Sequence, residues 1–289
     1  MQVKLIQTQR VLSPTQIPLA DYTINPYRGC GFGCLYCYAR ENKNIKNKGF
    51  KNIGVKINSP QILKQELKSK TPKRVLLGST TECFQYQEKK YKITEKILNI
   101  LNENNISYTI LTKSHLIEDY LHLIEKNKNN KIYFTLNFPS NRIIKIFEPN
   151  SSNTEKRLKA INEIIKKKIT LRIHAGPFMP YISNLDEIIK ILPKKIKELD
   201  IEMYHKKQGN FTEILKKIEF YLGRDTKEKL ESVYKNKGTY SEFIEKLEGK
   251  IKALDNLKKI KTFLIVPDFN EFYNSRIYYE TPVSQPGLD

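Results

Sequence analysis

The chain has 289 residues, of which 51 are Lys or Arg and 31 are Asp or Glu, so its formal net charge is +20. This length fits one or two domains, or a single β/α barrel of about 250 residues. The best apolar run, Thr262–Pro267, is far shorter than the roughly 20 residues of a membrane-spanning helix, so no membrane span is expected. Because the first residues also lack the apolar run of a secretory signal, we expect a cytoplasmic protein.

The positive charge has two interpretations. Only nine of the 51 basic residues are Arg, and the chain is also rich in Asn and Ile, as in the stretch Asn42–Lys48. A/T-rich codons produce this joint excess of Lys, Asn and Ile, so codon usage alone would give a Lys-rich, solvated surface. The alternative is a basic face that binds the phosphates of a nucleic acid. The sequence leaves both open.

Strand-like and helix-like segments alternate through the first two thirds of the chain. The expected strands are Val75–Leu77, Tyr108–Leu111, Ile132–Leu136, Thr170–Ile173 and Ile201–Tyr204. The helices expected between them begin at Ser59-Pro60 or contain Tyr91–Leu101, Leu116–Ile124, Leu158–Ile165 and Leu185–Leu192. This order predicts βαβ units and a parallel sheet. Repeated units of this kind suggest an open, barrel-like α/β sheet with its chemistry at the carboxyl ends of the strands.

The pattern changes near Gly209. Helices are expected at Phe211–Tyr221 and Tyr240–Leu257, followed by one strand at Phe263–Val266. We therefore expect a core domain of residues 1–208 and a helical C-terminal extension of residues 209–289 that packs on the barrel.

Three of the four cysteines lie close together. Cys30, Cys34 and Cys37 have the spacing C-x3-C-x2-C, and Cys83 stands alone. Because the trio would leave an odd thiol, a disulfide framework is not expected. Three thiolates on one loop can hold three corners of an iron–sulfur cluster and leave the fourth iron without a protein ligand. Zinc, which would recruit Cys83 or a histidine, and unbound thiols are the alternatives.

The flanking residues resemble a known family. Asn25–Cys30 (NPYRGC) and Tyr36–Arg40 (YCYAR) are similar to the cluster loop of radical S-adenosylmethionine (SAM) enzymes, in the branch related to spore photoproduct lyase. The aromatic Tyr36 before the last cysteine is typical of the superfamily. Thr81–Glu88 (TECFQYQE) resembles the branch's T-D-P-Y-Q-P-x-E segment after the second strand, with Glu82 in place of Asp and Cys83 in place of Pro.

The resemblance continues to about residue 185. It includes Leu111–Ser114, Glu148-Pro149 with Arg157, and Pro177–Pro180. The Arg-Asp pair of the family's third helix is missing near Asp119, and Tyr181 replaces a Gly. These departures leave the expected cofactor binding intact and put the substrate in doubt.

The resemblance implies a partial (β/α)6 radical SAM barrel. Such an enzyme reductively cleaves SAM at a [4Fe–4S] cluster, here held by Cys30, Cys34 and Cys37, and receives its electron from a reductant such as flavodoxin or ferredoxin. The branch further implies a lyase that repairs a DNA lesion, with nucleic acid as the substrate. The alternatives are a radical SAM enzyme that modifies a peptide or small metabolite, and a non-catalytic zinc-stabilised binding module.

The resemblance and the positions in the chain together suggest SAM ligands. Glu82 is placed to accept from the SAM ammonium, or is an exposed loop charge. Lys113 and Arg157 are candidates for the SAM carboxylate, or are solvated surface cations. Thr135 and Asn137 bind the ribose hydroxyls, or cap the fourth strand.

Further candidates lie at other strand ends. His174 contacts adenosine or substrate, or is a hydrogen-bonded core residue. Glu88 is expected to bind or orient a ligand. Cys83 is a candidate catalytic hydrogen-atom donor, as in spore photoproduct lyase, or a small apolar filler. The aromatic residues expected near the site either stack on a base or pack the barrel, and they are Tyr27, Tyr36, Tyr38, Phe84 and Tyr86.

Overall fold

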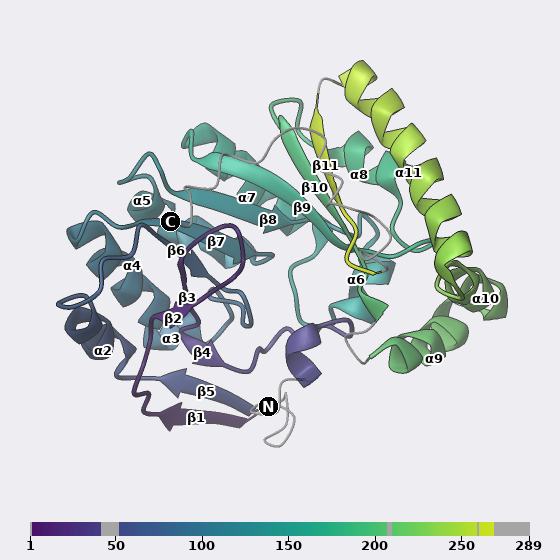
Figure 1. Cartoon of the computed structure of the whole chain (residues 1–289). Helices are drawn as coiled ribbons and strands as arrows, with labels where there is room; N and C mark the ends of the chain where they lie inside the picture. Colours follow the sequence, from purple (N-terminus) through teal and green to yellow (C-terminus); the bar gives the residue numbers. More distant parts are fainter. Residues whose placement is uncertain (1, 42–51, 207–209, 259, 269–289) are drawn as a thin grey trace. The chain divides into compact units, whose positions relative to one another are not determined.

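A computed structural model describes residues 2–41, 52–206, 210–258 and 260–268 (Figure 1). The chain forms two compact units. Unit 1 contains the residues up to Thr135 together with Ser140–Leu171, and unit 2 contains Leu136–Pro139 and the residues from Arg172 onward. The domain boundary expected at residue 208 stays a prediction. Within the described ranges, no helix is long and apolar enough to cross a bilayer.

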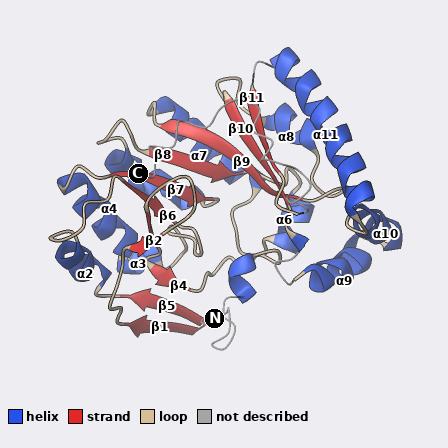
Figure 2. Ribbon diagram, in the orientation of Figure 1, coloured by secondary structure: helices blue, strands red, loops and turns tan. Residues whose placement is uncertain are grey.

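Unit 1 is built on a mostly parallel sheet. Its strands follow the order β8-β7-β6-β3-β2, with only β2 antiparallel to its neighbour. Their bounds are β2 Ser13–Pro14, β3 Tyr22–Ile24, β6 Arg74–Leu77, β7 Ser107–Thr112 and β8 Lys131–Thr135. Val75, Leu76 and Leu77 are fully buried, as expected for a parallel strand covered on both faces. The predicted parallel sheet is thus confirmed (Figure 2).

The helices of unit 1 follow its strands in the chain. Their bounds are α2 Ser59–Glu66, α3 Glu88–Tyr91, α4 Ile93–Glu103, α5 Leu121–Ile124, α6 Asn141–Phe147 and α7 Thr154–Lys166, with 3-10 segments η1 Tyr38–Glu41 and η2 His115–Tyr120. In α4, Ile93, Ile97 and Leu101 recur at helical spacing and are buried, so one face of the helix lies on the core. The single helix expected over Leu116–Ile124 is wrong in part, because η2 forms its first half and α5 its second.

Glu88 has a structural role that the sequence did not reveal. Its carboxylate accepts from the backbone N–H groups of Thr94 and Glu95, each at 2.9 Å, at the start of α4. The same carboxylate accepts from the Tyr27 hydroxyl on β4 (Tyr27–Arg28). A carboxylate that satisfies two free N–H groups caps a helix and complements its dipole. Glu88 therefore joins α4 to the strand that leads into the cysteine loop.

A small sheet is formed by strands on both sides of the cysteine loop in the chain. Its order is β1-β5-β4, where β1 spans Gln2–Ile6 and β5 spans Asn52–Lys56. β5 is parallel to β1 and antiparallel to β4. In Figure 1, β1 and β5 lie side by side near the N-terminus.

Unit 2 holds three parallel strands and the C-terminal helices. The strand order is β11-β10-β9, with bounds β9 Thr170–Phe178, which begins in unit 1, β10 Glu198–Met203 and β11 Lys261–Ile265. The helices are α8 Leu185–Ile191, α9 Phe211–Leu222, α10 Arg224–Val233 and α11 Lys237–Lys258. The helices expected at Phe211–Tyr221 and Tyr240–Leu257 are confirmed. The sequence missed α10, in which only Leu230 and Val233 are buried, so its apolar signal is weak.

Candidate active site

The cysteine loop leaves β4 at the carboxyl end of β3. Two segments that lie far away in the sequence hold its backbone. From residues 81–85, the Thr81 hydroxyl donates to the Gly29 carbonyl at 2.7 Å, and the Gln85 side-chain oxygen accepts from the Gly31 N–H at 2.9 Å. Gly29 has φ 75°, in the left-handed region that favours glycine. The loop shape therefore depends on a glycine and on two polar side chains from the segment after β6.

The second segment is residues 147–150, after α6. The Phe147 carbonyl accepts from the Leu35 N–H at 2.8 Å, and the Asn150 side chain donates to the Gly31 carbonyl at 3.1 Å. Gly33, with φ 62°, completes the curl between the first two cysteines. Because hydrogen bonds from both segments hold the loop, its three thiols are already ordered. Binding a ligand therefore costs little further conformational entropy.

Each thiol of the trio has a nearby hydrogen-bond donor. The backbone N–H groups of Phe32 and Glu82 lower the pKa of the Cys30 thiol, against the effect of burial. Two backbone N–H groups of the 3-10 segment that follows Cys37, those of Ala39 and Arg40, lower the pKa of its thiol. The Lys113 ammonium lies 3.8 Å from the Cys34 sulfur.

This donor set fits an iron–sulfur cluster. Hydrogen bonds to thiolate sulfur stabilise its charge and adjust the reduction potential of a bound cluster. Burial raises the pKa of the Cys30 thiol, and that of Cys34 to about 12, so binding iron must displace protons from the trio. Across the described ranges, no three His, Cys, Asp or Glu side chains surround a site for a single metal ion.

Glu148 is the centre of a buried charge cluster beside Cys34. Its carboxylate forms ion pairs with Arg157 and with Lys113, the latter at 3.0 Å, and accepts from the Tyr36 hydroxyl. The Lys113 ammonium also donates to the Tyr36 oxygen. Burial would raise the pKa of Glu148, but Arg157 and Lys113 outweigh it and hold that pKa well below its usual range. Glu148 is therefore ionised at any physiological pH.

The charge cluster around Glu148 shows whether Lys113 and Arg157 are buried or solvated. Arg157 is fully buried, and the Lys113 side chain is 15% exposed, so neither is a solvated surface cation. Arg157 also donates to Ser151 at 2.6 Å and to the Ser152 carbonyl at 2.8 Å. With its donors turned to Glu148 and these serines, Arg157 positions Glu148. Tyr36 belongs to the cysteine loop itself, and Lys113 lies against this loop beside Cys34.

Glu148 itself was missing from the candidate ligands. The sequence matched Glu148-Pro149 to the family pattern but gave Glu148 no role. The available signal was a carboxylate directly after the apolar residues Ile146 and Phe147, where an ionised side chain is expected to have a partner.

Glu82 lies between β6 and β7 and is buried. One carboxylate oxygen accepts from the Phe84 N–H at 3.0 Å and the Thr112 hydroxyl at 2.7 Å, and the other from the Lys113 N–H at 3.1 Å. Burial raises the pKa of Glu82 although these donors lower it. Glu82 is thus not an exposed loop charge, and its backbone N–H lowers the pKa of the nearby Cys30 thiol. Its contact with the SAM ammonium stays a prediction.

Cys83 is fully buried beside the loop. Burial raises the pKa of its thiol well above the usual value, and Glu82 and Glu88 raise it further. The thiol is therefore protonated at neutral pH. A β-carbon built on Gly78 would lie 3.4 Å from the Cys83 sulfur, so the sulfur fills the turn at the end of β6.

The remaining candidates are divided between the two units. In unit 1, Thr135 at the end of β8 is buried, and its carbonyl lies 3.5 Å from an Arg157 nitrogen. In unit 2, Asn137 is fully buried, and the Leu136 N–H beside it donates to the His174 carbonyl. The His174 ring lies 3.4 Å from the Glu202 carboxylate on β10. Roles of Thr135, Asn137 and His174 toward SAM or substrate stay predictions.

The aromatic residues separate into two groups. Tyr27, Tyr36 and Phe84 are buried and pack the site, whereas Tyr38 and Tyr86 are 45% and 48% exposed. The Tyr38 hydroxyl donates to the Ser79 carbonyl at 2.5 Å, which fixes its ring at the end of β6. Tyr38 and Tyr86 are the exposed members of this set, and the Tyr86 ring contacts the Phe32 ring.

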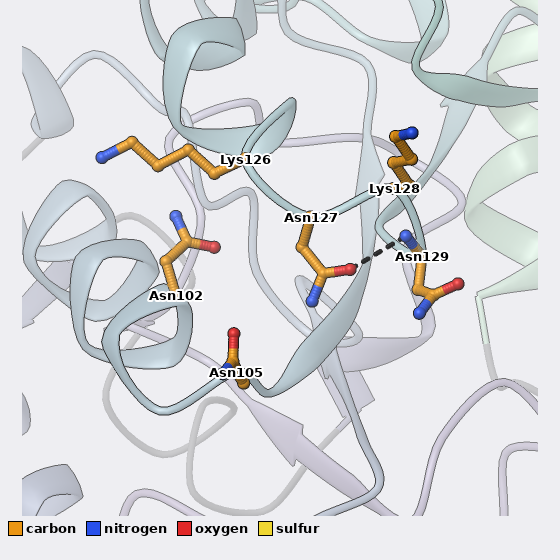
Figure 3. A pocket seen from close by; sticks show the side chains of 6 residues that line it. All are labelled: Asn102, Asn105, Lys126, Asn127, Lys128 and Asn129. Atoms are coloured by element: carbon orange, nitrogen blue, oxygen red, sulfur yellow. Dashed lines mark hydrogen bonds between the residues drawn. The ribbon is translucent and has the colours of Figure 1, made fainter.

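A hollow elsewhere in unit 1 is not this site. It encloses about 470 Å³ and is lined by Asn102, Asn105, Lys126, Asn127, Lys128 and Asn129 (Figure 3). Asn102 lies in the last turn of α4, and the other five residues belong to the loops that lead into β7 and β8, at the ends of the strands opposite the cysteine loop. Amide and ammonium groups alone offer neither a nucleophile nor a general base there.

Comparisons with known proteins agree with this geometry. Residues 24–192 match the model of the radical SAM superfamily. An uncharacterised protein of Methanocaldococcus jannaschii, MJ0683, is 30% identical over 187 residues, which cover 64% of this chain and 70% of that protein. Spore photoproduct lyase of Bacillus subtilis is 24% identical over 214 residues, covering 70% of this chain and 60% of the lyase. The chain spans about half the length of the mycobacterial relatives it also matches.

The fold has solved relatives. Spore photoproduct lyase complexed with dinucleoside spore photoproduct superposes with a TM-score of 0.55 at 17% identity, covering 76% of this chain and 65% of that one. The two proteins therefore share the fold, a parallel sheet with helices. Because the superfamily match covers more than half of the residues and includes the cysteine loop, the chain belongs to the radical SAM superfamily, whose members use a [4Fe–4S] cluster and SAM.

Proposed function

We propose that this radical SAM enzyme repairs a pyrimidine lesion in nucleic acid, as a lyase of the spore photoproduct lyase type. The observation that carries the proposal is the sequence similarity to spore photoproduct lyase, which covers 70% of this chain and so extends well beyond the cysteine loop. The solved relative binds a dinucleoside lesion. The basic surface is compatible with a polyanionic substrate.

The residues of unit 1 have distinct proposed tasks. When bound, the reduced cluster and SAM supply a 5′-deoxyadenosyl radical that removes a hydrogen atom from the substrate. Cys30, Cys34 and Cys37 hold the cluster. Lys113, kept in place by Glu148, offers its ammonium to the SAM carboxylate, and Glu82 offers a carboxylate oxygen to the SAM ammonium. The buried wall around Cys30 and Cys83 excludes water from the reacting atoms.

Glu82→Gln is expected to weaken SAM binding about 10- to 150-fold, because a charge-assisted hydrogen bond contributes roughly 1.5–3 kcal/mol. Equilibrium binding of SAM to the reconstituted protein measures the effect, and iron content shows that the cluster is retained. Glu88→Gln is the matched control, since Glu88 caps α4 instead. Equal SAM affinity in the wild type and in Glu82→Gln would assign the ammonium to another residue.

We propose that Cys83 returns a hydrogen atom to the substrate radical. A donor must keep its S–H bond, and burial holds the Cys83 thiol protonated. Homolysis of that bond would put hydrogen on the product carbon and leave a thiyl radical on sulfur. Because a thiol exchanges its proton with solvent, turnover in D₂O is expected to place deuterium in the product of the wild type.

Cys83→Ala is expected to cleave SAM but to release adducted product in place of the repaired pyrimidines. Mass spectrometry of the product made in D₂O separates the donor role from simple packing of the turn beside Gly78. Clean, undeuterated turnover by Cys83→Ala at the wild-type rate would assign the sulfur to packing alone.

The substrate is tested directly. Anaerobic protein reconstituted with iron and sulfide, reduced in the presence of SAM and dinucleoside spore photoproduct, is expected to form thymine products together with 5′-deoxyadenosine. Formation of 5′-deoxyadenosine without any change in the lesion would favour a peptide or small-metabolite substrate. A flavodoxin or ferredoxin as the reductant, and a cytoplasmic location, are part of the same proposal.

A further inference from the structure

Arg28 and Lys56 are neighbouring cations on one face of the small sheet of unit 1. Arg28 on β4 pairs with Gly54 on β5, and Lys56 follows two residues further along β5. Side chains two residues apart on a strand share a face, and such diagonal neighbours lie about 7–8 Å apart in antiparallel pairs. Lys4 on β1 also pairs with Gly54 and places a third cation on this face.

Among the residues that the structure describes, no carboxylate forms an ion pair with Arg28 or Lys56. The Lys56 ammonium donates to the Asn25 carbonyl at 2.8 Å, a neutral acceptor. Within the described residues, the Arg28 guanidinium takes part in no hydrogen bond or ion pair. Burial lowers the pKa of Lys56, and the positive charge of Arg28 lowers it further. A partly buried ammonium beside a like charge destabilises the fold unless an anion joins it.

The cation pair lies at the same edge of the sheet as the cysteine loop. Asn25, which accepts from Lys56, directly follows β3, and its side-chain oxygen accepts from the Thr80 N–H beyond the end of β6 at 2.9 Å. The side chain of Asn25 also donates to the Ser79 hydroxyl at 3.0 Å. Arg28 stands two residues before Cys30. In α/β sheets, this carboxyl edge is where ligands bind.

We propose that Arg28 and Lys56 bind a phosphate group of the substrate. A guanidinium can hold two phosphate oxygens at once, and an ammonium adds a point charge. The inference rests on the proposed function, from which the phosphate is a phosphodiester of the nucleic acid next to the lesion. Phosphate contacts of this kind place a strand in register without reading its sequence.

The test measures binding of a fluorescein-labelled oligothymidylate by anisotropy over a range of salt concentrations, with the cluster loaded. Arg28→Gln and Lys56→Gln are each expected to weaken binding about 10-fold and to reduce the slope of log affinity against log salt by about 0.7. Arg28→Lys keeps the charge and is expected to retain most of the slope. Lys126→Gln and Lys128→Gln, at the opposite ends of the strands, are the charge-matched controls.

A thermal melt of each variant shows whether it is folded. If Lys56→Gln does not fold, the variants of Arg28, whose side chain is partly exposed, provide the test. Inorganic phosphate is added as a competitor. If it saturates the Arg28–Lys56 site while the oligonucleotide stays bound, the pair binds a small phosphorylated ligand, and the assignment to a phosphodiester is wrong. If the Arg28 and Lys56 variants lose no more oligonucleotide affinity than the Lys126 and Lys128 controls, these two residues do not form a phosphate site. Lesion turnover is measured separately, so a protein that binds DNA through this pair but leaves the lesion unchanged contradicts only the proposed function.

Discussion

Replacement of Cys30, Cys34 or Cys37 with Ala is expected to abolish the cluster and SAM cleavage together. The three thiols lie on one loop that is held by residues 81–85 and 147–150, and each sulfur has its own donor. With two thiolates left, the cluster loses one of its three protein corners. Iron and sulfide analysis, the broad visible absorption after anaerobic reconstitution, and 5′-deoxyadenosine formation measure the effect.

Cys83→Ala is the matched control for these variants, because its sulfur is fully buried in the turn after β6. It is expected to assemble the cluster and to cleave SAM. A cluster that survives loss of Cys34 and disappears with Cys83 would show that the trio is not the ligand set. One tightly bound zinc without sulfide in the purified wild type would contradict the cofactor assignment.

Glu148→Gln is expected to destabilise the protein by about 3–5 kcal/mol, because it leaves the buried charges of Arg157 and Lys113 uncompensated. Arg157 is fully buried and ion-paired to Glu148. Urea unfolding of the metal-free protein measures the free energy of unfolding. The same variant releases Lys113 and Tyr36 from their positions beside Cys34, so SAM binding is expected to weaken as well.

Glu118→Gln is the control for this ion pair, since Glu118 pairs with Lys159, whose side chain is 72% exposed. A surface pair of that kind contributes about 0–1 kcal/mol. A loss below 1 kcal/mol in Glu148→Gln would contradict the role given to Glu148.

The charge cluster around Glu148 also makes the stability of the fold depend on pH. The pKa of Glu148 in the folded protein lies below its unfolded value of 4.5. Its contribution to stability is therefore complete above that pH and is lost as the pH falls below it. In Glu148→Gln, this part of the acid sensitivity is expected to disappear.

Local patterns in the sequence predicted the features that depend on nearby residues. The spacing of Cys30, Cys34 and Cys37 indicated a cluster loop before any tertiary contact was considered. Short apolar runs such as Val75–Leu77 predicted buried parallel strands, since a strand covered on both faces needs an unbroken apolar run. The motifs around the loop indicated the superfamily, because the order of residues along one loop is preserved in the sequence itself.

Only the tertiary structure decided the roles of the charged residues. Lys113, Glu148 and Arg157 come from different elements, and their meeting beside Cys34 depends on how β7, α6 and α7 pack. Nothing in the sequence around Lys113 or Arg157 distinguishes a buried cation from a solvated one, because burial is a property of the assembled core. Glu88 likewise became a helix cap only when α4 was placed next to its carboxylate. Arg28 and Lys56 share a face only because β4 and β5 pair in one register, which their separation along the chain does not determine.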